Sequence, residues 1–263
     1  MKKQLFLFVL MFLPLMASAF TGEVVINRIK YYIDTEDKTA EVRKRIYSGD
    51  VVIPETVEYD GVTCRVASIG DQAFNDCSEL TSVTIPNSVT SIGYGVFSGC
   101  SSLTSVTIPN SVTSIERNTF QYCSSLTSIT IGNSVTYIGD YAFYGCSGLT
   151  SIDIPNSVKN VGNDAFTGTP WFNNLPNGLI YIGKVAYIYK GKMPSNTSIT
   201  IKDGTLQIHN SAFYGCSSLT SITIPNSVTN IGTFAFRGCS SLTSVTIPNS
   251  VTYIGESAFI ECI

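Results

Sequence analysis

The side chains that carry out acid–base and nucleophilic chemistry are scarce in this sequence. Between residues 80 and 158 the carboxylates are Glu116, Asp140 and Asp153, and the chain has one histidine, His209. His209 stands where similar segments have glycine or Glu116, so we expect it on a tolerant surface corner. General acid–base catalysis needs a poised carboxylate or a histidine beside its partner. We therefore predict no enzymatic activity, no catalytic residue and no cofactor.

Two segments resemble ligand-binding loops but lack essential residues. Gly178 to Lys184 fits the GxxxxGK spacing of a phosphate loop, yet Val185 stands where a Ser or Thr would bind magnesium, and the intervening residues are apolar. We interpret Gly183-Lys184 as the turn of a β-hairpin. Residues 34–37 resemble half a calcium loop without its glycine and its closing glutamate. We predict no metal site.

Seven of the eight cysteines recur at one position of a repeated segment. Equivalent positions stacked about 4.8 Å apart would lie within the Cα separation that a disulfide allows. Because each of these cysteines lies close to a leucine in an apolar stripe, we favour a ladder of buried, reduced thiols. Disulfides between neighbours are the alternative, and the state of Cys64, off the ladder, stays open. The ladder residues are Cys77, Cys100, Cys123, Cys146, Cys216, Cys239 and Cys262.

Residues 167–196 concentrate aromatic and basic side chains. They include the one tryptophan of the chain, and no acidic residue occurs between Ala165 and Ile201. Aromatic residues mixed with cations are typical of interaction hot spots, and loops on a rigid scaffold often carry recognition. We predict a ligand-binding surface here; the alternative is that these aromatic side chains only pack back onto the rest of the chain. The candidate residues are Trp171, Phe172, Tyr181, Lys184, Tyr187, Tyr189, Lys190 and Lys192.

A repeat of 23 residues determines the fold. Phenylalanines recur at this spacing from Phe74 to Phe166 and again from Phe213 to Phe259, with an irregular coil between the two series. Each copy has a stretch of alternating apolar residues, typical of a short strand, followed by a glycine-rich turn. One copy cannot bury its apolar side chains alone, whereas stacked copies can. We predict a repeat solenoid of about nine coils with short parallel strands.

Hydroxyl groups should line the outward face of these strands. Serines recur at one outward position and threonines at the next, where Asp153 interrupts them. This face could bind a glycan or the backbone of a partner, or it could simply be a soluble face without charge repulsion. The serines are Ser82, Ser105, Ser128, Ser151, Ser198, Ser221 and Ser244, and the threonines are Thr84, Thr107, Thr130, Thr200, Thr223 and Thr246.

The repeat resembles a known family. The pattern C-x-x-L-x-x-[IV]-x-I-P-x-x-V-x-x-I-G-x-x-A-F, in six nearly identical copies, resembles the BspA-like, or Treponema-type, leucine-rich repeat over roughly residues 51–263. The resemblance implies a leucine-rich-repeat fold in a secreted or surface-displayed bacterial protein that binds host proteins or other cells.

The first residues have the features of an export signal. Lys2 and Lys3 precede an apolar run that ends in Ala17-Ser18-Ala19, as in a cleaved signal peptide. No second apolar run is long enough to span a membrane, and Phe20, rather than a cysteine, follows the expected cut. We predict a secreted or cell-surface protein without a membrane span after cleavage.

We divide the chain into a signal peptide (1–19), an N-terminal β cap (20–60), leucine-rich repeats (61–166), an irregular coil with a β-hairpin (167–196) and further repeats (197–263). Twelve of the 19 acidic residues lie between Glu23 and Glu79. Because charge is concentrated at this end of the chain, the alternative interpretation of residues 20–60 is a charged segment that recognises a partner. The sequence stops before the strand of a further copy. We therefore expect an uncovered final core layer and self-association through this end.

Composition narrows the function further. Charged residues make up 13% of the chain and the formal net charge is −3, which argues against a nucleic-acid partner. We predict a non-enzymatic binding protein that adheres to a host protein, a glycan or a neighbouring cell surface. The alternative is a self-assembling structural component of the cell surface.

Overall fold

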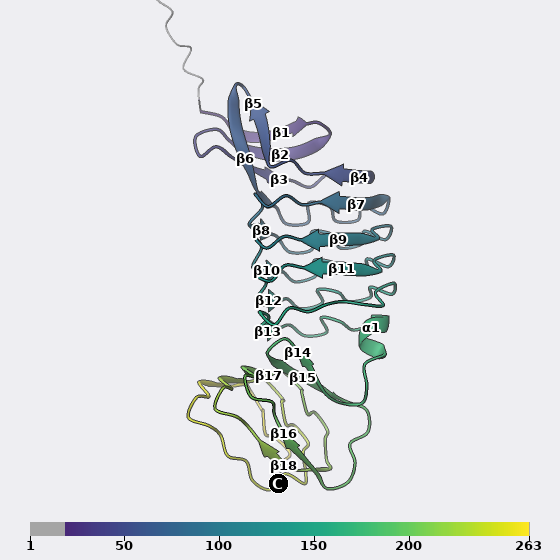
Figure 1. Cartoon of the computed structure of the whole chain (residues 1–263), viewed down its shortest axis with the longest axis vertical. Coiled ribbons are helices and arrows are strands. Elements are labelled where there is room, and N and C mark those ends of the chain that lie inside the picture. The colour runs from purple at the N-terminus through teal and green to yellow at the C-terminus, as the bar shows by residue number, and fades with distance from the viewer. Residues whose placement is uncertain (1–18, 263) are drawn as a thin grey trace, which may run out of the picture.

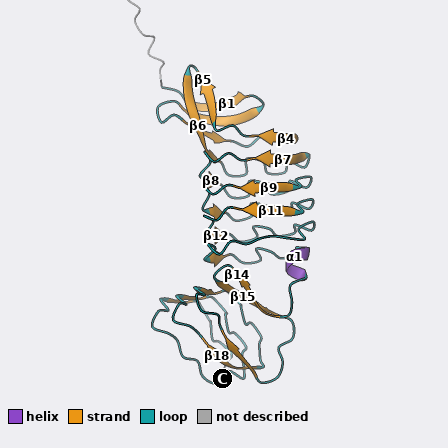
Figure 2. Cartoon of the chain, viewed as in Figure 1, coloured by secondary structure: helices purple, strands orange, loops and turns teal. Residues whose placement is uncertain are grey.

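The computed structural model describes residues 19–262, which form a β-solenoid (Figure 1). About nine coils with a spacing of about 23 residues follow one another, so the predicted fold class is confirmed. The predicted signal peptide, apart from Ala19, lies outside the described residues. Figure 2 shows that short strands and turns make up nearly all of the described chain; its helix is α1 (Pro170–Asn173).

The longer strands of the first coils stack in parallel along one side of the solenoid (Figure 1). Their registers join residues of the same repeat position, such as Ser82 with Ser105 and Ser105 with Ser128. Successive side chains of a strand point to opposite faces, so Val106 is buried while its neighbours Ser105 and Thr107 are exposed. The strands of this stack are β4 (Gly49–Val52), β7 (Leu80–Thr84), β9 (Ser105–Ile108) and β11 (Ser128–Ile131).

Two-residue strands form a second parallel line on the other side of these coils. The second residue of each is an apolar core residue, for example Ile115 and Ile138. These strands are β8 (Ser91–Ile92), β10 (Ser114–Ile115), β12 (Tyr137–Ile138) and β13 (Asn160–Val161).

The N-terminal segment forms a sheet in the order β1-β2-β3-β6-β5, and β8 joins this sheet by pairing in parallel with β6. The Asp34 carboxylate, in the segment that resembles a calcium loop, accepts hydrogen bonds from the Glu36 and Asp37 main-chain N–H groups and so closes a turn. After β3, the Tyr47 ring lies 4.6 Å from the ring of Phe74, the first of the stacked phenylalanines. The strands are β1 (Thr21–Ile26), β2 (Ile29–Asp34), β3 (Thr39–Val42), β5 (Thr56–Tyr59) and β6 (Val62–Ile69).

Stacked phenylalanine rings run through the core. Ring centroids from Phe74 to Phe166 follow one another at 5.3–5.4 Å, and those from Phe213 to Phe259 at 5.1 Å. Between the two series, Trp171 and Tyr187 pack edge-on against Phe166. The core accordingly divides into two clusters of buried residues, which meet at the irregular coil.

The second half begins with an antiparallel hairpin and continues with parallel coils that are turned relative to the first ones (Figure 1). In the last coil Ile254 is 48% exposed, while Ile247, Val251 and Phe259 are partly buried. The strands are β14 (Gly178–Ile182), β15 (Val185–Lys190), β16 (Thr197–Thr200), β17 (Gln207–Ile208), β18 (Leu219–Thr223), β19 (Asn230–Ile231) and β20 (Tyr253–Ile254).

Candidate binding cleft at the break in the strand stack

The stack of longer strands breaks after β11. In the next coil the strand pairing shrinks to a single bridge between Thr130 and Asp153. A new stack begins only with β16 and β18, where Ser198 pairs with Ser221. The single column of serines expected from the sequence is therefore divided in two, because the hairpin coil separates the stacks.

A cleft of about 630 Å³ lies at this break. The half-buried Ile152 and Ile154 line it from the first stack, and the loop after β16 lines it from the second. The irregular coil contributes three of the predicted binding residues, Trp171, Tyr181 and Lys184. The cleft thus joins apolar and aromatic surface with a few polar groups, as binding sites commonly do.

The start of α1 fixes the position of Trp171. Thr169 stands where the ladder would have a cysteine; its hydroxyl donates to the Phe166 carbonyl at 2.8 Å and accepts from the Phe172 N–H at 3.2 Å. Pro170 begins the helix, as is common at this position. The Trp171 N–H donates to the Leu149 carbonyl at 2.9 Å, and its ring lies 5.0 Å from Phe166. The tryptophan is therefore held against the core at the side of the cleft.

The hairpin predicted around Gly183-Lys184 is present. Gly183 has φ +55, and a Cβ on it would lie 2.5 Å from the Val158 carbonyl oxygen, so glycine is required both by conformation and by space. The Lys184 N–H donates to the same oxygen at 2.8 Å. This contact docks the hairpin on the preceding coil and places Lys184 at the cleft.

Charge in the cleft comes from Lys184, Lys202 and Asp203. The Lys202 ammonium lies 4.4 Å from the centre of the Tyr181 ring, and the Lys202 N–H donates to the Tyr181 hydroxyl at 3.1 Å. Burial raises the pKa of Tyr181, so its phenol stays neutral. The cleft presents aromatic rings with a small excess of positive charge, which suits a partner with apolar and acidic side chains.

The other predicted residues lie elsewhere. Phe172 and Tyr187 line a separate hollow of about 190 Å³, and Tyr187 is only 5% exposed. The Lys190 ammonium donates to three carbonyls near the end of α1, among them that of Phe172 at 3.0 Å. Tyr189 is half-buried against the second core, and Lys192 is exposed. The structure thus brings three of the eight candidates together in the cleft.

Sequence reasoning missed Ile152, Ile154, Lys202 and Asp203. The two isoleucines follow the same repeat pattern as their counterparts in the other coils, so nothing in the sequence shows that they are only half-buried. Lys202 and Asp203 could have been found from their position in the sequence, because they lie within three residues of the end of β16, the first strand after the irregular coil.

The expected surface position of His209 is wrong. His209 is 5% exposed, and its ring lies 4.6 Å from that of Tyr187. The position is tightly packed in several coils: at Gly139 and Gly232 a Cβ would lie 2.5 Å from a main-chain nitrogen of the preceding coil. At His209 the preceding coil is the hairpin. The hairpin leaves room for the imidazole side chain, and its residue Tyr187 covers the ring. Burial lowers the pKa of His209, so the ring is neutral near pH 7.

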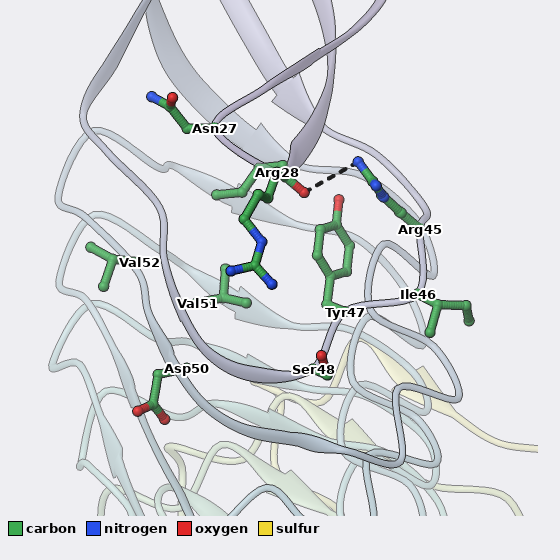
Figure 3. A pocket seen from close by; sticks show the side chains of 10 residues that line it. Asn27, Arg28, Arg45, Ile46, Tyr47, Ser48, Asp50, Val51 and Val52 are labelled. Carbon is green, nitrogen blue, oxygen red and sulfur yellow. Dashed lines mark hydrogen bonds between the residues drawn. The ribbon is translucent and has the colours of Figure 1, made fainter.

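A smaller pocket of about 180 Å³ lies between the N-terminal sheet and the first coil. Figure 3 shows Arg45 there, with its hydrogen bond to the main-chain carbonyl of Arg28. The Tyr47 hydroxyl donates to the Arg43 carbonyl, and Asp50 accepts hydrogen bonds from two hydroxyl groups of β7, which lower its pKa. Most of these polar groups are therefore already engaged, and the cleft is the better candidate.

Comparisons with known proteins agree with the repeat architecture. The family model described as BspA type leucine rich repeat region matches residues 62–173 and 181–263, in six copies. No curated protein matches the chain. Within residues 19–262, no helix has the length and apolar character needed to cross a membrane.

Solved structures of bacterial repeat proteins are similar to this chain. The T. pallidum leucine rich repeat protein is 24% identical, with a TM-score of 0.52 and coverage of 86% of this chain and 89% of the other. A leucine rich cell surface protein from Faecalibacterium prausnitzii is 26% identical, with a TM-score of 0.41 and coverage of 94% and 82%. The pneumococcal vaccine antigen PcpA is 19% identical, with a TM-score of 0.45 and coverage of 89% and 72%. The first of these similarities supports the fold.

Proposed function

Because the chain belongs to the BspA-type leucine-rich repeat family, we propose that it is an exported scaffold protein that binds a partner outside the cell through the cleft between its two strand stacks. The partner is a protein of the host extracellular matrix or of a neighbouring cell surface, and the biological role is adhesion. The proposal includes no catalytic step and no cofactor.

The strand edge in the cleft is the observation that carries this proposal. Ile152-Asp153-Ile154 continues the first strand stack, but its strand bridge is to Thr130, on the side away from the cleft. An open strand edge offers main-chain hydrogen bonds to an extended segment. Trp171 and Tyr181 add aromatic surface beside that edge, of the kind that anchors protein partners. These features favour an extended protein segment over a glycan.

Export is supported by the sequence of the first residues. The apolar run after Lys2 and Lys3, with Ala17-Ser18-Ala19 at its end, fits a signal peptide. Cleavage after Ala19 would leave Phe20 as the first residue, and N-terminal sequencing of the protein recovered from culture medium or the cell surface tests this.

Substitution of the cleft residues tests the proposed function. The triple variant Trp171→Ala, Tyr181→Ala and Lys184→Ala should lose at least ten-fold in capture by immobilised basement-membrane proteins, because truncated anchors at an interface cost about 2 kcal/mol or more. The matched control is Tyr94→Ala, Tyr253→Ala and Lys192→Ala, which removes exposed side chains of similar type outside the cleft. Equal capture by both variants, each with a native circular dichroism spectrum, would exclude the cleft.

The molar mass of the protein in solution distinguishes the binding scaffold from the alternative function, a self-assembling structural component of the cell surface. Growth into oligomers with rising concentration and without any added ligand would favour a self-assembling surface component. A constant molar mass by light scattering, together with saturable capture of a partner, would favour the binding scaffold.

A further inference from the structure

Three tyrosines surround a second groove, formed by the turns of the coils rather than by their longer strands. Tyr122, Tyr141 and Tyr144 line this groove of about 570 Å³, which shares no residue with the cleft. The Tyr144 ring lies 5.6 Å from that of Tyr122 and 5.7 Å from that of Tyr141, both nearly perpendicular to it. Tyr122 is 54% exposed and Tyr141 40%. The three rings therefore form an open aromatic corner.

The backbone at two of these tyrosines is unfavourable for an aromatic residue. Tyr122 has φ +59 and Tyr141 has φ +56, in the left-handed region that glycine and asparagine tolerate best. Five other coils have glycine at the Tyr122 position, namely Gly99, Gly145, Gly168, Gly215 and Gly238. The Tyr122 ring also needs Gly145 beside it, because a Cβ there would lie 2.6 Å from its Cδ1. The left-handed conformation recurs at these turn positions in other coils, for example at Asn118 and Ser211, so the turn does not require an aromatic side chain there.

The polar groups of the groove can accept hydrogen bonds and attract a cation. The Asp164 carboxylate lines it and accepts a bond from the Thr167 hydroxyl at 2.9 Å. The Asn118 Oδ1 atom also belongs to a lining residue, is buried, and has no hydrogen-bond partner among residues 19–262. No lysine or arginine lines the groove. Its charge is therefore complementary to a positively charged group.

The same turn in the second half of the chain already holds a cation. Arg237 occupies the repeat position of Tyr144, and Phe234 that of Tyr141. The Arg237 guanidinium lies 5.4 Å from the centre of the Phe234 ring and 5.6 Å from that of Tyr214, and it pairs with Glu261 at 3.2 Å. Turns of this solenoid can thus hold a guanidinium beside aromatic rings and a carboxylate. In the groove Tyr144 takes the place of the arginine, and Tyr122 and Asp164 supply a second ring and a carboxylate from other turn positions than Tyr214 and Glu261 do.

We propose that the groove of Tyr122, Tyr141, Tyr144 and Asp164 binds an exposed arginine side chain of a partner protein. The rings contact the guanidinium faces, and the Asp164 carboxylate accepts its N–H groups. This site is separate from the cleft, and its test does not depend on what the cleft binds.

The test uses a peptide with one arginine, acetyl-Gly-Gly-Arg-Gly-Gly-amide. Its titration is followed through the tyrosine ring resonances of the folded protein by NMR. We expect saturable shifts at Tyr122, Tyr141 and Tyr144, and binding at least five-fold weaker when neutral citrulline replaces arginine. Equal binding of the citrulline peptide, no shift at the three rings, or shifts there with neutral maltohexaose but not with the arginine peptide would overturn the proposal.

Two substitutions separate binding from folding. Tyr122→Gly and Tyr141→Asn introduce residues that suit the left-handed backbone, and neighbouring coils have them at the same positions as Gly99 and Asn118. Each variant should melt no lower than the wild type and should bind the peptide at least five-fold more weakly. Asp164→Asn should weaken binding in the same way, whereas Glu36→Gln, an equal change of charge in the N-terminal sheet, should not. Unchanged binding in the tyrosine variants would contradict the site.

Discussion

The thiol of Cys123 donates a hydrogen bond to the main-chain carbonyl oxygen of Phe97, in the preceding coil, at 3.0 Å. Cys100, Cys146, Cys239 and Cys262 bond in the same way to the phenylalanine 26 residues earlier. Five of the seven ladder cysteines therefore link their coil to the one before it through S–H···O=C bonds. All eight cysteines are free thiols. The hydrogen bond requires this reduced state, because a disulfide sulfur has no hydrogen to donate.

The first prediction concerns the pH dependence of stability. Burial raises the pKa of Cys100, Cys146 and Cys239 to about 12, against an ordinary value of 9.0. Above pH 9 the unfolded chain loses thiol protons that the folded chain keeps, so the free energy of unfolding should fall as pH rises from 9 towards 12. Urea unfolding at pH 7, 9 and 10 measures this, and the triple Cys→Ala variant should show a shallower fall. The same slope in both proteins would contradict the buried-thiol account.

Thiol labelling gives an independent check of the ladder. A thiol reagent at pH 8 should modify few groups in the folded protein and eight after unfolding, since all eight cysteines are unpaired. Fewer than eight labelled groups after unfolding, without reductant, would show that disulfides form in the exported protein.

The second prediction concerns the hairpin turn. Gly183→Ala should lower the free energy of unfolding by about 3 kcal/mol, because a Cβ would meet the Val158 carbonyl in addition to the cost of a left-handed backbone. Gly204→Ala is the matched control: its φ is +81, but no atom lies within 4 Å of the new Cβ. It should cost about 1–2 kcal/mol. Equal losses in urea unfolding would show that the hairpin tip is not docked on Val158.

The third prediction separates structural from binding residues of the irregular coil. Lys190→Met should lower the free energy of unfolding by about 1–2 kcal/mol, because three carbonyls near α1 lose a charged donor. Lys192→Met, at an exposed side chain, should change it by less than about 0.5 kcal/mol. A stability loss at Lys192 and none at Lys190 would reverse the assignment.

Much of the fold could be predicted from the sequence because the same pattern of apolar residues recurs in many coils. Each coil has the same strand pattern, so the stacking of Phe74 on Phe97 and the burial of every ladder cysteine except Cys262 follow from the 23-residue period alone. The hairpin could be predicted as well, since Gly183-Lys184 is a turn signal between two apolar strands.

The irregular coil could be predicted only in outline, because its side chains have no repeated copies to compare. Composition marks aromatic and basic residues but does not say which ones face the solvent, and Tyr187 and Lys190 serve packing and helix capping. The tyrosine groove was missed for a different reason. Tyr122 and Tyr141 fill turn positions that vary among coils, and only the structure shows that residues of successive coils meet there.

The central claim is that a partner occupies the cleft beside Trp171. Because Trp171 is the one tryptophan of the chain, protein labelled with 5-fluorotryptophan has one ¹⁹F resonance, which reports on the cleft directly. Titration with the captured partner protein should shift this resonance to saturation, with the same midpoint as binding measured independently. Saturable binding that leaves the Trp171 resonance unchanged would contradict the account.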